Sequence, residues 1–457
     1  MLPSELRFEI NTFKLKWFIG LIYILMFAVL GFQEAKKVTG IIIAINGIMI
    51  LATLPILLKQ EALEKIISPV ILTRAVFVQI LVQLSIYLYW GKFNLAAITR
   101  LPLVFHQICF GYLFVFLLSH LKGKKFKLSF STAAAILSAN LFVWFSSHIY
   151  YSHYALIVIA LTAKTFITIK VNGEERHIFN PSGFASNIAA VVISLITVGY
   201  IQNNIYASQM GANFLWLPNF DTFVFLASCI SLWAPNMYLV PIACIITMTM
   251  FELWSDHYYG MSFTTETPRG SILLGITLLI TDPATAPRSK TGQFLYGVGY
   301  AFSIFISFII IAYFNFQMYF VKVFFLIPLN LLSYRIDLIG QWIETNFLSK
   351  IKFQWPEKKR KMLLAYMFVS FLSTAFLSFR HPPPYYLDFT RKIRPNIQDL
   401  KTEEMNFHRP SFLHMVSPMH FFHMFTVFFT TENRPLIPYK SSRKMNEDFD
   451  QFKEEYR

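Results

Sequence analysis

Charged residues and cysteines are both scarce in this sequence. Asp, Glu, Lys and Arg make up only 14% of the 457 residues, whereas 55% are hydrophobic and 17% are aromatic. One soluble core cannot use that much apolar surface, so the composition predicts a polytopic membrane protein. The three cysteines, Cys109, Cys229 and Cys244, are too few for a four-thiolate iron–sulfur cluster or a disulfide framework. Walker, Rossmann, zinc-protease and nucleophile-elbow motifs are also missing from the sequence.

Long apolar runs separated by short connections fill most of residues 15–380. An apolar run of about 17–25 residues is long enough to cross a bilayer as a helix. Such runs lie at 15–32, 38–58, 70–90, 101–120, 129–147, 149–169, 184–203, 220–236, 238–254, 293–315, 318–334 and 362–380. They predict an all-α fold with about 10–13 transmembrane helices. A shorter run at 270–281 ends at an Asp-Pro step and predicts a broken or re-entrant half-helix.

Positive charge lies mainly between the apolar runs and in the tail. The net charge is +15, with clusters of Lys and Arg at 122–127 and 350–361. Basic loops of this kind face the cytoplasm in membrane proteins, so we expect lipid and no nucleic acid as a partner. We expect a multi-pass protein of the cell (inner) membrane. Its predicted parts are a transmembrane domain at 1–335, an interfacial helix with a basic loop and a last span at 336–380, and a polar tail at 381–457.

Two Asx-Pro steps interrupt the apolar pattern, at Asn180-Pro181 and at Asp282-Pro283. An Asx side chain caps the free N–H groups of a helix start, and proline fits the first helical turn. We therefore expect two half-helices that point their positive ends at a shared site, which suits an anion or a phosphorylated cofactor. The two steps also raise the possibility of an internal inverted repeat.

Three cations near these steps each have two possible roles. Lys164 lies in an apolar run before Asn180, where it either pairs with a phosphate or carboxylate or extends to the cytoplasmic surface. Arg288 and Lys290 follow Asp282, where they either attract an anion or only orient the neighbouring helices.

Several acidic residues and histidines also have two possible roles, one functional and one structural. For Asp282 the capping role is favoured over cation binding or proton relay. Glu252, Asp256 and His257 form either an ion path or, as we favour, a solvated span end. The histidines of the tail, from His408 to His423, fit an amphipathic surface helix better than a metal site, so no metal is expected.

The two motifs together carry a family resemblance. The segment Arg176 to Gly183, paired with the segment Thr281 to Pro287 and the following Gly292, resembles the RnfD/NqrB family of membrane subunits, found in the Rnf complex and the sodium-translocating NADH:quinone reductase. The resemblance is strongest over residues 150–300. It implies two inverted repeats of helices around a flavin, and electron transfer through the membrane coupled to movement of Na⁺ or H⁺.

In that family FMN is esterified through its phosphate to a Thr in a Ser-Gly-Ala-Thr motif before the Asp-Pro step. Here the matching segment reads Arg269-Gly270-Ser271-Ile272, so the acceptor position holds Ile272, which has no hydroxyl. The resemblance therefore implies a flavin that is bound non-covalently or has been lost. The residues it nominates for cofactor binding, with the cations named above, are Lys164, Asn180, Pro181, Ser182, Gly183, Gly270, Ser271, Thr281, Asp282, Thr285, Arg288, Lys290 and Gly292.

Three functions follow from these observations. The first is a membrane electron-transport subunit of RnfD/NqrB type, with other electron-transfer subunits or a soluble redox protein as partners. The second is a non-redox transporter or channel for a small solute or anion, because paired half-helices serve transport equally well. The third is a membrane subunit that docks a soluble redox enzyme through its basic surface.

Overall fold

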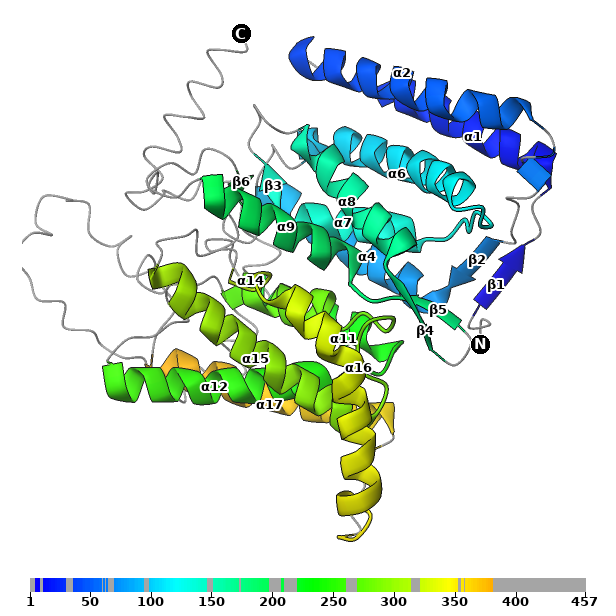
Figure 1. The fold of residues 1–457 in the computed structure, drawn as a ribbon. Helices are drawn as coiled ribbons and strands as arrows, with labels where there is room; N and C mark the ends of the chain where they lie inside the picture. Colours follow the sequence, from blue (N-terminus) through cyan, green and yellow to red (C-terminus); the bar gives the residue numbers. More distant parts are fainter. Residues whose placement is uncertain are drawn as a thin grey trace, which may run out of the picture.

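The computed structural model describes most of the chain up to Arg380 (Figure 1). The described residues are 5–8, 11–29, 36–59, 61, 63–64, 70–93, 98–145, 151–171, 174–196, 207–208, 220–259, 269–313, 321–351, 355–356 and 358–380. Predictions for the polar tail at 381–457 and its histidines lie outside these residues, as do those for the side chains of Asp256 and His257.

The first half of the chain is built from helices that follow the apolar runs. They are α1 (Thr12–Ala28), α2 (Lys36–Leu58), α4 (Arg74–Phe93), α6 (Leu101–Leu121), α7 (Ser131–Phe142), α8 (Ser152–Phe166) and α9 (Pro181–Ile196). The Asn11 side chain caps α1, where its Oδ1 accepts a hydrogen bond of 2.9 Å from Lys14 N. Pro102 lies in the first turn of α6, where a missing N–H costs nothing.

The second half is also helical, and two of its helices include π-helical turns. Its elements are α11 (Phe220–Trp233), α12 (Leu239–Tyr259), α14 (Arg269–Leu274), the π-helix η3 (Gly275–Leu279), α15 (Lys290–Tyr313), α16 (Leu326–Ile343), the π-helix η5 (Glu344–Leu348) and α17 (Lys359–Arg380). The short helix α14 with η3 ends before Thr281, which confirms the broken helix predicted for the run at 270–281.

Strands are few and short in the described part of the chain. They form three antiparallel pairs, namely β1 (Glu5–Phe8) with β2 (Val70–Thr73), β3 (Trp144–Phe145) with β6 (Ala207–Ser208), and β4 (Thr168–Val171) with β5 (Glu174–His177). The β4–β5 hairpin pairs Thr168 with His177, and so places His177 just before the start of α9. The predicted all-α fold class is confirmed.

Two described helices, Thr39–Leu58 and Leu101–Leu121, are each long and apolar enough to cross a membrane. Five further apolar helices among the described residues have 10–17 residues: Ser131–Phe142, Ser152–Phe166, Pro181–Ile193, Phe223–Trp233 and Leu239–Trp254. Large apolar side chains also face outward, such as Leu51, which is 75% exposed. The number of membrane crossings stays a prediction.

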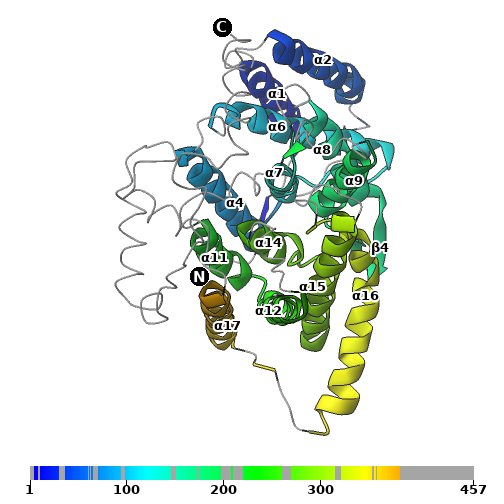
Figure 2. The same ribbon diagram turned by 90° about the vertical axis from the view of Figure 1, so that its left-hand side faces the viewer.

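The buried side chains form two clusters. The larger one joins α2, α4, α6, α7, α8, α9, α11, α12, α14, α15, α16 and α17 and contains the buried tyrosines Tyr238, Tyr296, Tyr300 and Tyr366. The smaller one joins α1 and α2 to α6 and α8. Figure 2 shows α14 between α11, α12 and α15, and Leu274, Ile276, Leu278 and Leu279 of α14 and η3 belong to the larger cluster. The broken helix is therefore in the interior of the protein.

The last two long helices are joined to the rest in different ways. α16 packs on α15 and then projects beyond the other helices (Figures 1 and 2). It is one continuous helix from Leu326 to Ile343, so the boundary predicted between residues 335 and 336 falls in its middle. α17 packs against α12 and α11, and its Tyr366 Oη lies 2.7 Å from Ser228 Oγ.

Candidate functional site

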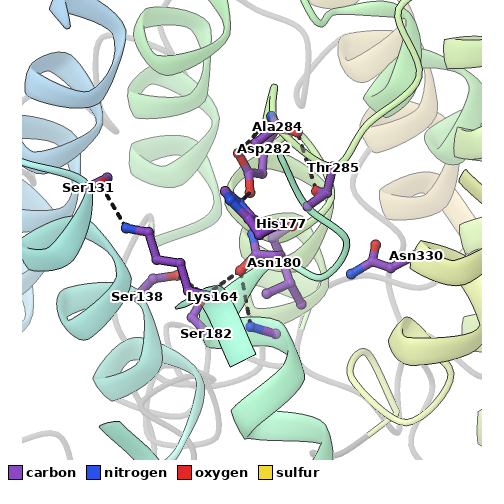
Figure 3. Close-up of polar contacts among 12 residues, drawn as sticks. Ser131, Ser138, Lys164, His177, Asn180, Ser182, Asp282, Ala284, Thr285 and Asn330 are labelled. Atoms are coloured by element: carbon purple, nitrogen blue, oxygen red, sulfur yellow. Dashed lines mark hydrogen bonds and ion pairs between the residues drawn. The ribbon is translucent and has the colours of Figure 1, made fainter. Parts of the chain in front are cut away.

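The two Asx-Pro segments, about 100 residues apart in the sequence, meet in the structure (Figure 3). Asn180 Nδ2 donates a hydrogen bond of 2.9 Å to Leu279 O, at the end of η3. His177 Nε2 lies 3.2 Å from Asp282 Oδ2. The contacts predicted between these segments are therefore present, with His177 as an additional member.

Asn180 caps α9 as the sequence predicts. Its Oδ1 accepts hydrogen bonds from Gly183 N at 3.1 Å and from Ser182 Oγ at 2.8 Å. Pro181 is the first residue of α9. Ser182 Oγ also lies 3.0 Å from Ser138 Oγ, which links the start of α9 to α7. Asn180 is only 5% exposed, so these bonds are shielded from water.

The prediction that Asp282 begins a helix is wrong. Asp282 opens an isolated turn in which its Oδ1 accepts a bond from Ala284 N, and its backbone oxygen accepts bonds from Thr285 N and Ala286 N. The helix α15 starts only at Lys290. The intervening residues form turns and bends, and Ser333 Oγ of α16 donates a hydrogen bond to Thr285 O among them.

As a result, the predicted pair of opposed positive helix ends does not form. The start of α9 meets the carbonyl end of η3, where Asn180 bridges a helix start and a helix end. The start of α15 faces α16 instead. Arg288 N and Ser289 N both donate to Asp337 Oδ1, at 3.0 and 2.8 Å, and Thr291 N donates to Glu344 Oε1 at 2.7 Å.

The positive end of α15 is thus occupied by two carboxylates of the same chain. Asp337 of α16 and Glu344, the first residue of η5, lie seven residues apart, and both accept hydrogen bonds from the start of α15. Ser289 Oγ also donates to Asp337 Oδ1 at 2.7 Å, and Lys290 Nζ donates to Asn236 O at 3.3 Å. These donors, which sequence reasoning assigned to a phosphate, are engaged within the protein and do not fit a second anion.

This arrangement predicts a stability effect for Asp337→Ala. The substitution leaves Arg288 N and Ser289 N without their acceptor and removes a negative charge from a helix start, which costs about 2 kcal/mol. We expect a lower thermal unfolding temperature of the detergent-purified chain. Arg335→Ala, at an exposed position of the same helix, is the control and should change the unfolding free energy by less than about 0.5 kcal/mol. Equal unfolding temperatures for both variants would contradict the capping role.

Lys164 is half-buried near the end of α8, and its Nζ donates a hydrogen bond of 2.7 Å to Ser131 Oγ of α7 (Figure 3). Thr281 Oγ1 donates to Thr277 O, and Thr285 Oγ1 lies 3.4 Å from Asp282 O, so both hydroxyls are engaged locally.

Two of the nominated glycines lie where helices approach closely. A Cβ added at Gly183 would lie 2.2 Å from Leu326 Cδ2, so the Leu326 side chain of α16 would have to shift. A Cβ added at Gly292 would lie 2.5 Å from Ser289 Oγ and 3.1 Å from Asp337 Oδ1. Both glycines therefore allow the first turns of α9 and α15 to lie close to their neighbours.

The remaining nominated residues lie at another place in the fold. Gly270 and Ser271 are at the start of α14, and Asp282 follows the end of η3, about 15 Å further along at 1.5 Å per residue. Ile272, at the acceptor position, is 6% exposed and belongs to the larger core cluster. The thirteen candidates thus separate into a group around Asn180 and Asp282, a group at the start of α15, and the start of α14.

Charges outside the helices are paired at the β4–β5 hairpin. The hydrogen bond from Lys124 Nζ to Glu175 Oε2, with the charges of nearby lysines, lowers the pKa of the Glu175 carboxyl. Among the described residues, no group of three or more His, Cys, Asp or Glu side chains is arranged to hold a metal ion.

Sequence analysis did not identify four residues that the structure places at the Asx-Pro segments, at the start of α15 or beside the broken helix. Ser138, Asp337 and Glu344 complete hydrogen bonds of the motifs from distant elements, and no local pattern links them to the motifs. Lys322 lies in the turn before α16 and is 2% exposed. An isolated lysine between the apolar segments 301–321 and 323–332 was its one sequence signal.

Comparison with known proteins identifies one related family. Residues 220–327 match the model of the NQR2, RnfD, RnfE family, a range that includes α11, α12, α14, η3, α15 and the Asp282-Pro283 step. The segment Arg176 to Gly183 lies outside the matched range. Searches of curated proteins and of solved structures gave no significant match. The resemblance to the RnfD/NqrB family is therefore confirmed over residues 220–327, and the chain is an all-α membrane protein.

Proposed function

We propose that the chain is a multi-pass subunit of an Rnf/Nqr-type electron-transport complex in the cell (inner) membrane, and that it binds FMN non-covalently beside α14. The observation that carries the proposal is the family match across 220–327, whose centre is the broken helix α14–η3 in the protein core. Its proposed partners are lipid and the other electron-transfer subunits of such a complex.

The residues around the start of α14 support a bound flavin better than the Asx-Pro cluster does. At Asn180 and at the start of α15, the backbone donors already bind side chains of the protein. Near α14, by contrast, the glycine Gly275 and the buried cation Lys322 lie side by side. Ile272 cannot form the phosphate ester, so packing and charge would have to hold the flavin.

We also propose that two repeats build the protein, at residues 74–196 and 220–343. Helix contacts support this pairing, in which α6, α8 and α9 correspond to α12, α15 and α16. In the first repeat α8 packs on both α6 and α9. In the second repeat α15 packs on both α12 and α16. The repeats meet through their first helices, α4 with α11, and their last, α9 with α16, as a two-fold relation requires. In this pairing Asn180 and Asp282 occupy different connections of the two repeats.

Polar side chains buried in the apolar helices support coupling of electron transfer to ion movement. His106 Nε2 lies 2.9 Å from Asn46 Oδ1, its Nδ1 lies 2.6 Å from Tyr154 Oη, and Asn140 Nδ2 donates to Gln107 Oε1 at 2.8 Å. Polar groups at such depth are costly, and they often mark ion or proton paths.

The full chain, purified in mild detergent, tests the flavin directly. We expect a flavin absorbance spectrum, either as purified or after incubation with FMN, at about one flavin per chain. A protein that unfolds cooperatively yet acquires no flavin at saturating FMN would overturn the proposed function. Anion or solute flux in liposomes that is independent of redox state would then favour the transporter.

A further inference from the structure

The helix α16 carries a set of large apolar side chains on its outer face, which we call the apolar stripe. Leu331, Leu338 and Trp342 share this face because they are seven and four residues apart, and they are 55%, 41% and 63% exposed. Leu332 and Ile339 lie beside them and are also exposed. Apolar side chains gathered on one face of a helix mark a surface that contacts lipid or another protein.

The opposite face of α16 fixes the direction in which the stripe points. Asp337 of α16 and Glu344 of η5 accept hydrogen bonds from the start of α15. Gly340 is buried, and a Cβ added there would lie 2.3 Å from Gly292 N. Because these contacts hold α16 against α15 along one side, the apolar stripe on the other side must face away from the protein.

The direction of α16 differs from that of the helices that can cross a membrane. In Figure 1, α2, α6, α12 and α17 run across the view, whereas α16 runs down it. Figure 2 shows α12 nearly end-on and α16 along its length. The helices α2 and α6 contain the two segments that are long and apolar enough to cross a bilayer. In a membrane that these segments cross, α16 therefore lies close to the membrane plane.

The exposed charge of α16 agrees with this orientation. Arg335 lies in the middle of the helix and is exposed, between Leu331 and Leu338 in the sequence. If α16 crossed the bilayer, this arginine would face the hydrocarbon core, which is unfavourable. In a helix at the membrane surface, its guanidinium group can instead reach the headgroups while its methylene groups stay among the acyl chains.

Further cations follow the projecting end of α16, between η5 and the first turn of α17. The exposed ones among the described residues are Lys350, Lys358, Arg360 and Lys361. Trp355 ties this segment to the start of α15, because its Nε1 donates a hydrogen bond of 2.9 Å to Thr291 Oγ1. Lysines and arginines beside membrane helices attract the anionic lipids of the cytoplasmic leaflet. The apolar stripe thus lies next to a group of cations that suits an anionic lipid surface.

We propose that α16 and η5 lie in the cytoplasmic surface layer of the membrane and bind anionic phospholipid. The apolar stripe packs among the upper parts of the acyl chains, with Trp342 at the level of the headgroups. The phosphate groups of the lipids are bound by Arg335, Lys350, Lys358, Arg360 and Lys361. This inference goes beyond the proposed function and does not depend on a bound flavin.

Nitroxide labels on the full chain, reconstituted in liposomes of phosphatidylcholine and phosphatidylglycerol, test the orientation. The labels are attached in Leu331→Cys, Leu338→Cys and Trp342→Cys, and their depth is measured from their accessibility to oxygen and to a water-soluble nickel complex. We expect all three at one depth, just below the headgroups. A helix that crosses the membrane would instead separate the first and last labels by about 16 Å, at 1.5 Å per residue, and would overturn the proposal.

Two controls accompany the depth measurement. Ile48→Cys carries a label at an exposed position of α2, inside the apolar segment Thr39–Leu58, and should lie deeper than the labels on α16. The unmodified chain gives the background, since Cys109 and Cys244 are buried and Cys229 is half-buried. Labels on α16 that neither oxygen nor the nickel complex reaches would mean that a protein surface covers the stripe, which would also overturn the proposal.

Lipid selectivity tests the role of the cations. The unmodified chain should immobilise spin-labelled phosphatidylglycerol more strongly than spin-labelled phosphatidylcholine, and the double variant Lys350→Gln with Lys358→Gln should lower this preference at least twofold. Lys125→Gln with Lys127→Gln removes two exposed charges from the loop after α6 and should lower it less. If the two double variants lower the preference equally, or if neither changes it, the assignment of the α16 cations to anionic lipid is wrong.

Discussion

Gly340→Ala should lower the unfolding free energy of the protein by about 3 kcal/mol, because the added methyl group has no room at the crossing of α15 and α16. A Cβ at Gly340 would lie 2.3 Å from Gly292 N, 2.6 Å from Gly292 Cα and 2.7 Å from Ser289 Oγ. The first two atoms are backbone, so α16 must move away from the start of α15 and take Asp337 and Glu344 with it. We expect a lower thermal unfolding temperature of the chain in detergent.

Gly47→Ala is the matched control for this prediction. Gly47 is also inside a helix, α2, but a Cβ there would meet no atom within 4 Å. Alanine is the better helix former by about 1 kcal/mol, so this variant should be as stable as the original or slightly more so. If Gly340→Ala unfolds at the same temperature as Gly47→Ala, the close crossing of α15 and α16 is not present in the protein.

Asn180→Leu should cost about 3–5 kcal/mol, because leucine has a similar size but cannot form hydrogen bonds. The substitution removes three bonds at once and leaves Gly183 N, Ser182 Oγ and Leu279 O buried without this partner. The unfolding free energy of Asn180→Asp should lie between those of the unmodified protein and Asn180→Leu. A carboxylate can still accept a hydrogen bond from Gly183 N, but it cannot donate one to Leu279 O. Thermal unfolding of the three proteins measures this order.

Asn11→Ala tests whether the effect belongs to the bridge or to capping in general. Asn11 caps α1 through one exposed bond to Lys14 N, so its loss should cost only about 1 kcal/mol. Equal destabilisation by Asn180→Leu and Asn11→Ala would mean that the contact between α9 and η3 contributes nothing to stability.

The parts of the fold that depend on neighbouring residues could be predicted from the sequence. Apolar runs gave the helices, and Asn180 before Pro181 gave a capped helix start. The short run at 270–281 indicated a broken helix because twelve or so residues cannot span a bilayer. Each of these conclusions rests on periodicity, run length or cap chemistry within one segment.

The parts that depend on distant residues could not be predicted. Asp282 carries the same local signal as Asn180, yet it opens an isolated turn whose Thr285 O is bound by Ser333, and α15 starts seven residues after Pro283. The donors near Arg288 could serve a phosphate as well as a carboxylate, and only the approach of α16 decides that Asp337 binds them. Lys322 stands alone in the sequence, and folding brings it to Gly275.

The packing of α17 bears on how the protein can be shortened for experiments. Tyr366 is fully buried and lies 2.7 Å through its hydroxyl from Ser228 of α11, and Thr249 Oγ1 of α12 lies 2.5 Å from Ser373 Oγ. Both partners belong to the segment that matches the family. A truncation at residue 335 would therefore remove α17 from its contacts with α11 and α12 and would end the chain in the middle of α16. A protein prepared for experiments should extend at least through Arg380.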